Sequence, residues 1–366
     1  MKILEIVLSL SNGGAERFVV DLSNEMSKSE DVTLLVLKDF EIGSNDFYKK
    51  EVSDRVKLIN LGFKDGFKFS YLIKVMNMVR TIGPDIVHIH DVADKYCILP
   101  TMFHTSKKIF VQTIHNDINS LYKDIFHKFT LGFLGKIKHL NFVTISDQNS
   151  RDFSNIYSAT SNKMIYNGRA KLMASPKFDD VKNEVSNLKP NESTLVLLHI
   201  ARCASQKNQE LLITSFNRWV ESGANAILLV CGSGFDSEQG EKLKRFSCEN
   251  IHFLGPKSNV ADYLLCADAF ALSSLFEGMP ITVIEAISLG IPVLSTPVCG
   301  VLDTIRDKEN GCISKDFTED SYVEMLNNYS TLCRSLKKKC AQRETSVYSI
   351  EFCAKSYLEY FITLSH

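Results

Sequence analysis

The chain has 366 residues, of which 45% are hydrophobic and 23% are charged, and its formal net charge is −1. This is the composition of a globular protein. It excludes extensive disorder, and it excludes the strong basic excess typical of a general nucleic-acid-binding protein. The length favours two domains, each large enough for a core of its own.

Cysteine usage and the apolar runs bear on the cellular compartment. The 10 cysteines include no C-x-x-C pair and no ligand-like cluster, and most lie in apolar runs, which favours a reducing cytoplasm. The N-terminal run MKILEIVLSLS lacks a basic region and a cleavage site, so it predicts a strand and not a signal peptide. No apolar stretch reaches about 18 residues, so we expect no membrane-spanning helix.

Along the first half of the chain, short apolar runs alternate with longer segments of helical period. This pattern is typical of a doubly wound α/β domain with parallel strands. Helices are predicted between the strands, for example at residues 15–28 and 69–83. The predicted strands are residues 2–10, 32–38, 56–61, 85–90, 108–115 and 142–146.

The same pattern restarts after residues 171–192, a polar segment with two prolines that we interpret as a linker. The sequence therefore predicts two Rossmann-like α/β domains, residues 1–170 and 193–345. Residues 346–366 have helical spacing, and the period alone leaves open whether this helix covers the second domain or crosses back to the first. The second set of predicted strands comprises residues 194–201, 226–232, 251–255, 269–274 and 291–296.

The stretch LFEGMPITVIEAISLG reads as a turn followed by a helix, with Pro280 in the first turn. Its first free amides, at Ile281 and Thr282, would form an anion site at the carboxyl edge of the sheet. Glu277 lies in the turn and Glu285 in the helix, where their carboxylates could accept from sugar hydroxyls beside a diphosphate. The alternative is that Glu277 caps the helix and Glu285 pairs with a lysine.

A second strand, loop and helix occur in HIARCASQKNQELL, where Arg202 and Lys207 follow the strand. Arginine as a fork and lysine as a point charge could both reach the same diphosphate and neutralise a leaving group without a metal. Alternatively, both are solvated surface cations.

Near the N-terminus, Gly13 and Gly14 lie between the first strand and the first helix, and glycine lets a backbone approach a phosphate closely. The full G-x-G-x-x-G fingerprint is absent, so a dinucleotide site is weakly supported and a simple tight turn is an alternative. Farther on, His115 ends a predicted strand, and His88 and His90 share one face of another. For zinc, the further ligands that those two histidines would need are not evident.

Taken together, these segments resemble the large family of retaining glycosyltransferases of the GT-B fold, often called family four. The resemblance covers nearly the whole chain and includes the family's pair of glutamates separated by seven residues, here Glu277 and Glu285. The segments that carry it are, in order, NGGAER, TIHND, TISD, IYNG, ARCASQKN, VCGSG, IHFLG, CADAF and EGMPITVIEA. Departures are Ala201 in place of the usual glycine and Cys203 in place of a common leucine.

The resemblance implies two domains facing each other across a cleft, with the C-terminal helix on the first domain. It also implies roles for individual residues. Glu277 would bind the donor sugar near the reacting carbon, Glu285 the ribose, and His115 the acceptor side of the sugar. Arg202 and Lys207 would hold the diphosphate, aided by the amides of Ile281 and Thr282 and the backbone at Gly14. The donor site would also include Gly13, Gly278 and Met279.

The reaction that the resemblance implies is transfer from a nucleotide-diphosphate sugar, a UDP-sugar in our expectation, to an acceptor hydroxyl with retention at the anomeric carbon. No D-x-D motif is present, so no metal and no other cofactor is expected. Alternatives that share the fold are a sugar-nucleotide epimerase, which would not be expected to keep this ordered set of motifs, and a non-catalytic subunit, which would be expected to lose one of the charged residues. A dehydrogenase would need the complete glycine fingerprint.

Residues 64–74 and 121–139 interleave Lys and His with Phe, Tyr and Leu. Such segments can seat a protein on an anionic membrane, although helices with one buried and one solvated face explain them as well. Because many members of the resembled family build surface polysaccharides on lipid carriers, we expect a glycan or lipid-linked acceptor. We also expect a cytoplasmic protein with peripheral contact to the inner face of the membrane.

Overall fold

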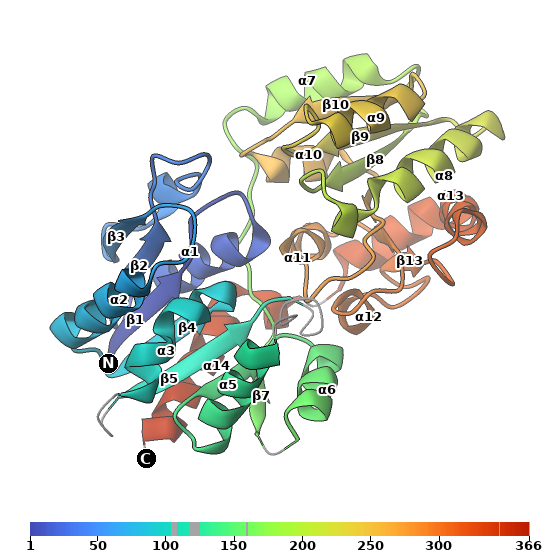
Figure 1. Ribbon diagram of the computed structural model, residues 1–366. Coiled ribbons are helices and arrows are strands. Elements are labelled where there is room, and N and C mark those ends of the chain that lie inside the picture. The colour runs from blue at the N-terminus through green and yellow to red at the C-terminus, as the bar shows by residue number, and fades with distance from the viewer. Residues whose placement is uncertain (104–107, 117–124, 159, 344, 366) are drawn as a thin grey trace. The chain divides into compact units, whose positions relative to one another are not determined.

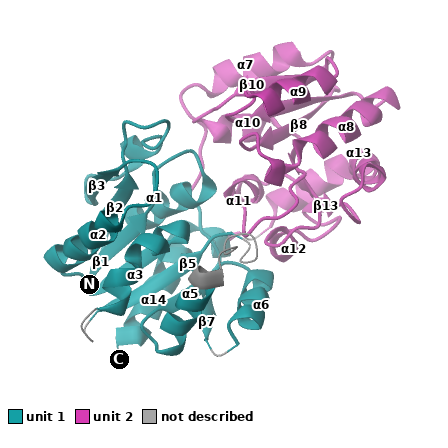
Figure 2. Cartoon of the chain, in the orientation of Figure 1, with its two compact units in different colours: residues 1–170, 346–366 teal, residues 171–345 magenta. Residues whose placement is uncertain are grey.

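The computed structural model describes residues 1–103, 108–116, 125–158, 160–343 and 345–365 (Figure 1). The chain forms two compact units, coloured separately in Figure 2. Unit 1 contains residues 1–170 and 346–366, and unit 2 contains residues 171–345. The last helix of the chain therefore belongs to the N-terminal unit.

Unit 1 is built on a parallel sheet whose strand order, over the described residues, is β3-β2-β1-β4-β5-β6-β7. Its strands are β1 Lys2–Val7, β2 Asp31–Lys38, β3 Lys57–Phe63, β4 Ile86–His90, β5 Ile109–Ile114, β6 Asn141–Thr144 and β7 Asn162–Met164. Its helices are α1 Gly14–Met26, η1 Lys49–Glu51, α2 Phe69–Ile82, η2 Asp91–Ala93, α3 Asp94–Met102, α5 Ile125–Lys136, α6 Asp147–Ile156, η4 Ser346–Tyr348 and α14 Ile350–Ser365.

The central strands of unit 1 are buried on both faces, which is why they read as nearly continuous apolar runs in the sequence. Helix α14 packs against this unit through the buried side chains of Tyr357 and Phe361. The hydroxyl of Tyr357 lies 2.9 Å from Oγ1 of Thr113 in β5, so the end of the chain is hydrogen-bonded to the centre of the sheet.

Unit 2 has a second parallel sheet with strand order β10-β9-β8-β11-β12-β13 in the part that the structure describes. Its strands are β8 Leu195–Ile200, β9 Ala226–Cys231, β10 Ile251–Gly255, β11 Ala269–Leu272, β12 Val293–Ser295 and β13 Gly311–Ile313. Its helices are α7 Phe178–Leu188, η3 Ser205–Lys207, α8 Gln209–Glu221, α9 Glu238–Phe246, α10 Val260–Cys266, α11 Ile281–Ser288, α12 Val301–Thr304 and α13 Glu319–Ala341.

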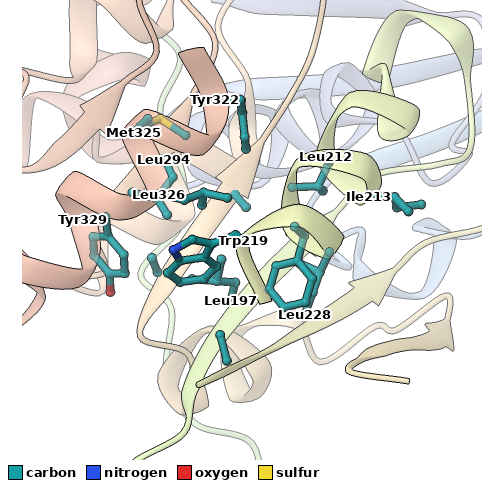
Figure 3. Close-up of a cluster of buried hydrophobic side chains, with 14 of the residues drawn as sticks. Leu197, Leu212, Ile213, Trp219, Leu228, Leu294, Tyr322, Met325, Leu326 and Tyr329 are labelled. Carbon is teal, nitrogen blue, oxygen red and sulfur yellow. The ribbon is translucent and has the colours of Figure 1, made fainter. Parts of the chain in front are cut away.

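The core of unit 2 joins strands β8, β9 and β12 to helices α8 and α13 (Figure 3). Trp219, the only tryptophan of the chain, is buried there with Tyr322 and Tyr329 of α13. The hydroxyl of Tyr329 donates to the carbonyl of Asp268 at 2.7 Å, so this polar atom of the aromatic cluster is hydrogen-bonded.

A strand occurs at every position predicted from the sequence, and the α/β fold class is confirmed. The structure adds β7 and β13, which were not predicted, and it differs in the segment predicted as a linker. Residues 171–192 contain helix α7, whose Val181 and Val185 are buried in unit 2. All ten cysteines are free. Among the described residues, no helix combines the length and the apolar character needed to cross a bilayer.

Candidate active site

Two loops of unit 2 leave the carboxyl ends of the neighbouring strands β8 and β11 and are hydrogen-bonded to each other. The amide of Leu275 donates to the carbonyl of Gln206 at 2.8 Å, and the Gln206 side chain donates to the carbonyl of Phe276 at 2.9 Å. The hydroxyl of Ser273 donates to the carbonyl of Lys207 at 2.8 Å. These bonds fix the side chains that the two loops carry relative to each other, at the sheet edge where open α/β sheets bind ligands.

Lys207 and Glu277, one from each loop, form an ion pair. The lysine Nζ lies 2.5 Å from Oε1 of Glu277, and the hydroxyl of Ser274 donates to the same oxygen at 2.6 Å. The Glu277 carboxylate is therefore buried but compensated, as a buried charge must be. Glu277 does not cap the following helix, because no side chain caps α11. The capping role that the alternative gave to Glu277 is thus excluded, and Glu277 pairs with Lys207 instead.

Helix α11 begins at Ile281, and Pro280 occupies the N-cap position rather than the first turn. The ψ of 124° at Pro280 is extended, and the fixed φ of proline accommodates it. The first amides of a helix have no acceptor within the helix. At Ile281 and Thr282, immediately after the Glu277 loop, the helix therefore presents N–H groups that can bind an anion.

Gly278 and Met279, between Glu277 and the helix, are buried beneath the loop that follows β12. Gly300 of that loop has a φ of +69°, and a Cβ on it would lie 1.9 Å from the carbonyl oxygen of Gly278. A side chain at position 300 would therefore displace the segment that connects Glu277 to α11.

Arg202 is exposed, two residues beyond the end of β8. Its carbonyl accepts from the side chain of Gln209 at 2.9 Å, which holds the loop backbone, and no ion pair engages its guanidinium in the described ranges of the chain. Gly232 supports the same loop, because a Cβ there would lie 1.9 Å from the carbonyl oxygen of Ala201. Glu285 is buried in α11, four residues after Ile281 and hence on the same side of the helix.

In unit 1, Gly13 is the N-cap of α1 and Gly14 its first residue. The carboxylate of Glu16 folds back over this turn and accepts from Ser11 at 3.0 Å. A Cβ on Gly13 would lie 2.1 Å from Oε2 of Glu16, so glycine leaves room for that carboxylate at the start of the helix. Glu16 was not singled out in the sequence, although an acidic residue in the first turn is a recognised helix-start signal.

His115 directly follows β5 and is 6% exposed. Its backbone N–H donates to Oδ1 of Asp91 at 2.8 Å, and its Nε2 lies 2.9 Å from Nδ1 of His90. Burial, reinforced by His90 and His88, holds the pKa of His115 well below its usual value, so the ring is neutral at pH 7. His90 thus adjoins His115, and His88 lies beside His90.

The residue that sequence reasoning missed beside these histidines is Glu5 of β1. Its Oε2 lies 2.6 Å from Nε2 of His90 and 2.9 Å from Nδ1 of His88, and all three side chains are fully buried. Strands β1 and β4 are adjacent in the sheet, with Glu5 opposite His88, which brings Glu5 close to both histidines. In the sequence, however, Glu5 and His90 are 85 positions apart. An acidic residue inside an apolar strand was the available signal.

Asp91 was also missed, although it directly follows His90. It adopts a φ of +43°, a conformation uncommon outside glycine, and accepts from the side chain of Asn116 at 3.1 Å. Burial, together with Glu16 and Asp94, raises the pKa of Asp91 to about 7 despite the hydrogen bonds that it accepts.

Comparison with known families separates the chain into the same two halves. The model described as Glycosyl transferases group 1 matches residues 180–344, and the model described as Glycosyltransferase Family 4 matches residues 12–168. The chain belongs to the group 1 glycosyltransferases. The group 1 match contains Arg202, Lys207, Glu277 and Glu285, and the Family 4 match contains Gly13, Gly14 and His115.

Individual relatives of this glycosyltransferase agree with the family. An uncharacterised glycosyltransferase of Methanocaldococcus jannaschii is 27% identical over 69% of each chain. The capsular polysaccharide biosynthesis glycosyltransferase CapH of Staphylococcus aureus is 21% identical over 99% of each. The crystal structure of HepE from Anabaena in complex with UDP-glucose matches with a TM-score of 0.80, at 15% identity, over 99% of this chain and 100% of that one. The predicted GT-B fold of two Rossmann-like domains is confirmed.

Proposed function

We propose that this glycosyltransferase transfers a sugar from a nucleoside-diphosphate sugar to an acceptor hydroxyl with retention of anomeric configuration. The observation that carries the proposal is the arrangement at the carboxyl edge of the unit 2 sheet. There, two loops that are hydrogen-bonded to each other carry two cations, Arg202 and Lys207, and the buried carboxylate of Glu277. The start of α11, which no side chain caps, follows directly.

The diphosphate is proposed to lie at the start of α11. The amides of Ile281 and Thr282 supply N–H donors there, with the backbone at Gly278 and Met279 close by. Arg202 adds a fork of donors, and its exposed guanidinium can move to the phosphates without giving up an ion pair with the described residues. In unit 1, the backbone at Gly13 and Gly14 is proposed as a further phosphate contact.

Lys207 serves the diphosphate and Glu277 at the same time. An ammonium carries three donors, so Lys207 can keep its bond to Glu277 while donating to a phosphate oxygen. The pair is thereby preorganised, because the lysine orients the carboxylate before any ligand arrives. Glu277 is proposed to accept from hydroxyls of the transferred sugar, and Glu285, farther along α11, from the hydroxyls of the nucleotide ribose.

Retention is proposed to follow from attack on the same face from which the nucleotide departs. The bond between the anomeric carbon and the diphosphate oxygen breaks, the acceptor oxygen bonds to that carbon, and the acceptor proton passes to the departing phosphate. Positive charges and N–H groups already aimed at that phosphate stabilise its developing charge, and one well-placed donor contributes about 3 kcal/mol. No metal is required in this scheme. His115 is proposed to contact the sugar.

A UDP-sugar is the proposed donor, and a glycan or lipid-linked acceptor in surface polysaccharide assembly the proposed target. The capsular polysaccharide role in the name of CapH and the UDP-glucose bound to HepE support these choices. The proposed location is the cytoplasm, at the inner face of the membrane.

Exposed apolar side chains beside lysines on unit 1 support contact with an anionic membrane. Phe69 and Ile73 lie in the first turns of α2 and Phe67 just before it, and Phe129, Phe133 and Ile137 recur every four residues along and after α5. Lys64, Lys68, Lys136 and Lys138 are exposed among them. Of the segment 121–139 predicted from the sequence, residues 121–124 and the side chains of 125–127 lie outside the described part of the structure.

The proposal is tested by incubating purified protein with a panel of nucleotide sugars and following nucleotide release and the anomeric configuration of the first sugar product by NMR. We expect one donor, a UDP-sugar, to be cleaved with retention and without added metal. Inversion would contradict the mechanism, and interconversion of sugar epimers without nucleotide release would favour the epimerase alternative. Tight nucleotide binding with no turnover on any donor or acceptor would favour a non-catalytic subunit.

A further inference from the structure

A line of buried polar side chains crosses the centre of the unit 1 sheet and ends at His115. Glu5 on β1 contacts His90 on β4 at 2.6 Å, and His90 contacts His115 beyond β5 at 2.9 Å. The exposed fractions of the three side chains are 0%, 1% and 6%. Burying three titratable side chains in the core of a sheet costs free energy unless they are hydrogen-bonded. Because the three side chains contact one another, the proton positions on one ring determine those on the next.

The position of the proton on His90 follows from its two neighbours. Burial lowers the pKa of His90 to about 4, so the ring is neutral at pH 7 and carries one N–H. Burial alone would raise the pKa of Glu5, but His88 and His90 lower it to about 2, so Glu5 is ionised and can only accept. Since the contact between them joins His90 Nε2 to a Glu5 oxygen, the proton lies on Nε2 and Nδ1 is bare.

The same reasoning carries to His115. The bare Nδ1 of His90 is an acceptor, so the Nε2 of His115 that faces it must carry the proton. His115 is neutral as well, which leaves its Nδ1 bare. That nitrogen is buried and has no hydrogen-bond partner among the described residues. A buried acceptor without a donor calls for an explanation.

We infer that Glu5 and His90 are positioning residues that hold His115 in the Nε2–H tautomer, so that its Nδ1 accepts a hydrogen bond from a hydroxyl of the bound sugar. That the hydroxyl belongs to a sugar substrate rests on the proposed function. The tautomer of His115 is independent of that function. With the opposite tautomer, His115 would present an N–H and could not accept from a hydroxyl.

A metal ion is the competing explanation, because ligand atoms of Glu5, His88 and His90 lie within 4.8 Å of one another. Two ligand atoms on one tetrahedral zinc, each about 2.0–2.2 Å from the metal, would be roughly 3.3 Å apart. The observed separations of 2.6 Å and 2.9 Å from the Glu5 oxygen to His90 and His88 are shorter than this, and the contact with His90 is a hydrogen bond.

The direct test is NMR of protein labelled with ¹⁵N-histidine, in which protonated and bare ring nitrogens have well-separated shifts. His115→Gln identifies the signals of His115 by their loss. The ligand-free protein should show a bare Nδ1 and a protonated Nε2 at His115, and the Nδ1 signal should shift when UDP-glucose binds. A protonated Nδ1 in the ligand-free protein, or no shift while calorimetry records binding, would overturn the inference.

Glu5→Met removes the acceptor that fixes His90 while keeping a side chain of similar length. We expect a measurable fraction of His115 to change to the Nδ1–H tautomer and donor turnover to fall roughly tenfold or more, as expected for one lost buried hydrogen bond. Tyr357→Phe is the matched control. It removes a hydroxyl from the same buried region, but that hydroxyl is bonded to Thr113 and not to His90. It should retain the tautomer and turnover within about threefold of wild type.

An unchanged His115 tautomer in Glu5→Met would remove Glu5 from this role. One equivalent of zinc in the purified protein that is lost in Glu5→Met would show that the cluster is a metal site, and the inference would be wrong. Because the tautomer is measured without substrate, a failure of the proposed sugar transfer would be recognised separately, by the absence of turnover in wild type.

Discussion

Arg202→Ala and Lys207→Ala should both weaken nucleotide binding, but only the lysine change should cost stability. Breaking a fully buried ion pair costs about 3–5 kcal/mol, mainly because one charge is left uncompensated. The side chain of Lys207 is 18% exposed and that of Glu277 is 7% exposed. Partial access of water to the lysine lowers the expected cost of Lys207→Ala to about 1–3 kcal/mol. Arg202 is exposed, and Arg202→Ala should stay within about 0.5 kcal/mol of wild type.

The sole tryptophan, Trp219, lies in the core of unit 2, so its fluorescence during urea unfolding reports the stability of the unit that carries both residues. Titration calorimetry with UDP measures binding, and each variant should lose at least about 1.4 kcal/mol, a factor of ten. The double variant Lys207→Ala/Glu277→Gln should recover much of the lost stability, because it no longer buries an unpaired charge. Equal unfolding midpoints for Lys207→Ala and Arg202→Ala would refute this reasoning.

Three further outcomes are expected. Turnover should survive EDTA, because two cations and a helix start neutralise the diphosphate; loss of activity that Mg²⁺ restores would contradict this. Gly300→Ala should abolish UDP binding, because its Cβ would meet the Gly278 carbonyl oxygen at 1.9 Å. Gly223→Ala is the control, since Gly223 also has a positive φ, +101°, but no atom within 4 Å of an added Cβ, and this variant should lose stability only. Equal UDP affinities in the two variants would be inconsistent with the packing. Burial lowers the pKa of His199 from 6.5 to about 4, so between these pH values the ring is protonated in the unfolded chain and neutral in the folded chain. The free energy of unfolding of unit 2 should therefore fall by up to about 3 kcal/mol as the pH falls from 6.5 to 4. In His199→Gln this loss should disappear from the Trp219 urea transitions, and an unchanged pH dependence would count against it.

Most of the fold could be predicted because both sheets are parallel and buried. Strands such as β1, β2 and β9 read as apolar runs that helical segments separate, which is the pattern of parallel strands covered by helices on both faces. The strands that were missed, β7 and β13, have three residues each and carry no such run. Helix α7 was missed because only Val181 and Val185, four residues apart in a polar segment, signal its buried side.

The sequence could predict which residues of the candidate site lie in loops after the strands, but not which side chains contact one another. Arg202, Lys207, Glu277 and the start of α11 follow from the order of strand, loop and helix. The partners do not, because the Lys207–Glu277 pair spans 70 positions and no local pattern carries such a contact. Glu5 was missed for the same reason, since its histidine partners come from another strand.

The central claim is that the site in unit 2 binds a nucleotide sugar with Glu277 on the transferred sugar and Glu285 on the ribose. Calorimetry of Glu277→Gln and Glu285→Gln with UDP and with UDP-glucose tests it most directly. Glu277→Gln should bind UDP nearly as well as wild type and lose affinity only for the intact donor, whereas Glu285→Gln should bind both ligands more weakly, because a ribose hydroxyl prefers an ionised acceptor. Loss of UDP binding in Glu277→Gln together with unchanged binding in Glu285→Gln would reverse the two roles and contradict the proposed orientation of the donor.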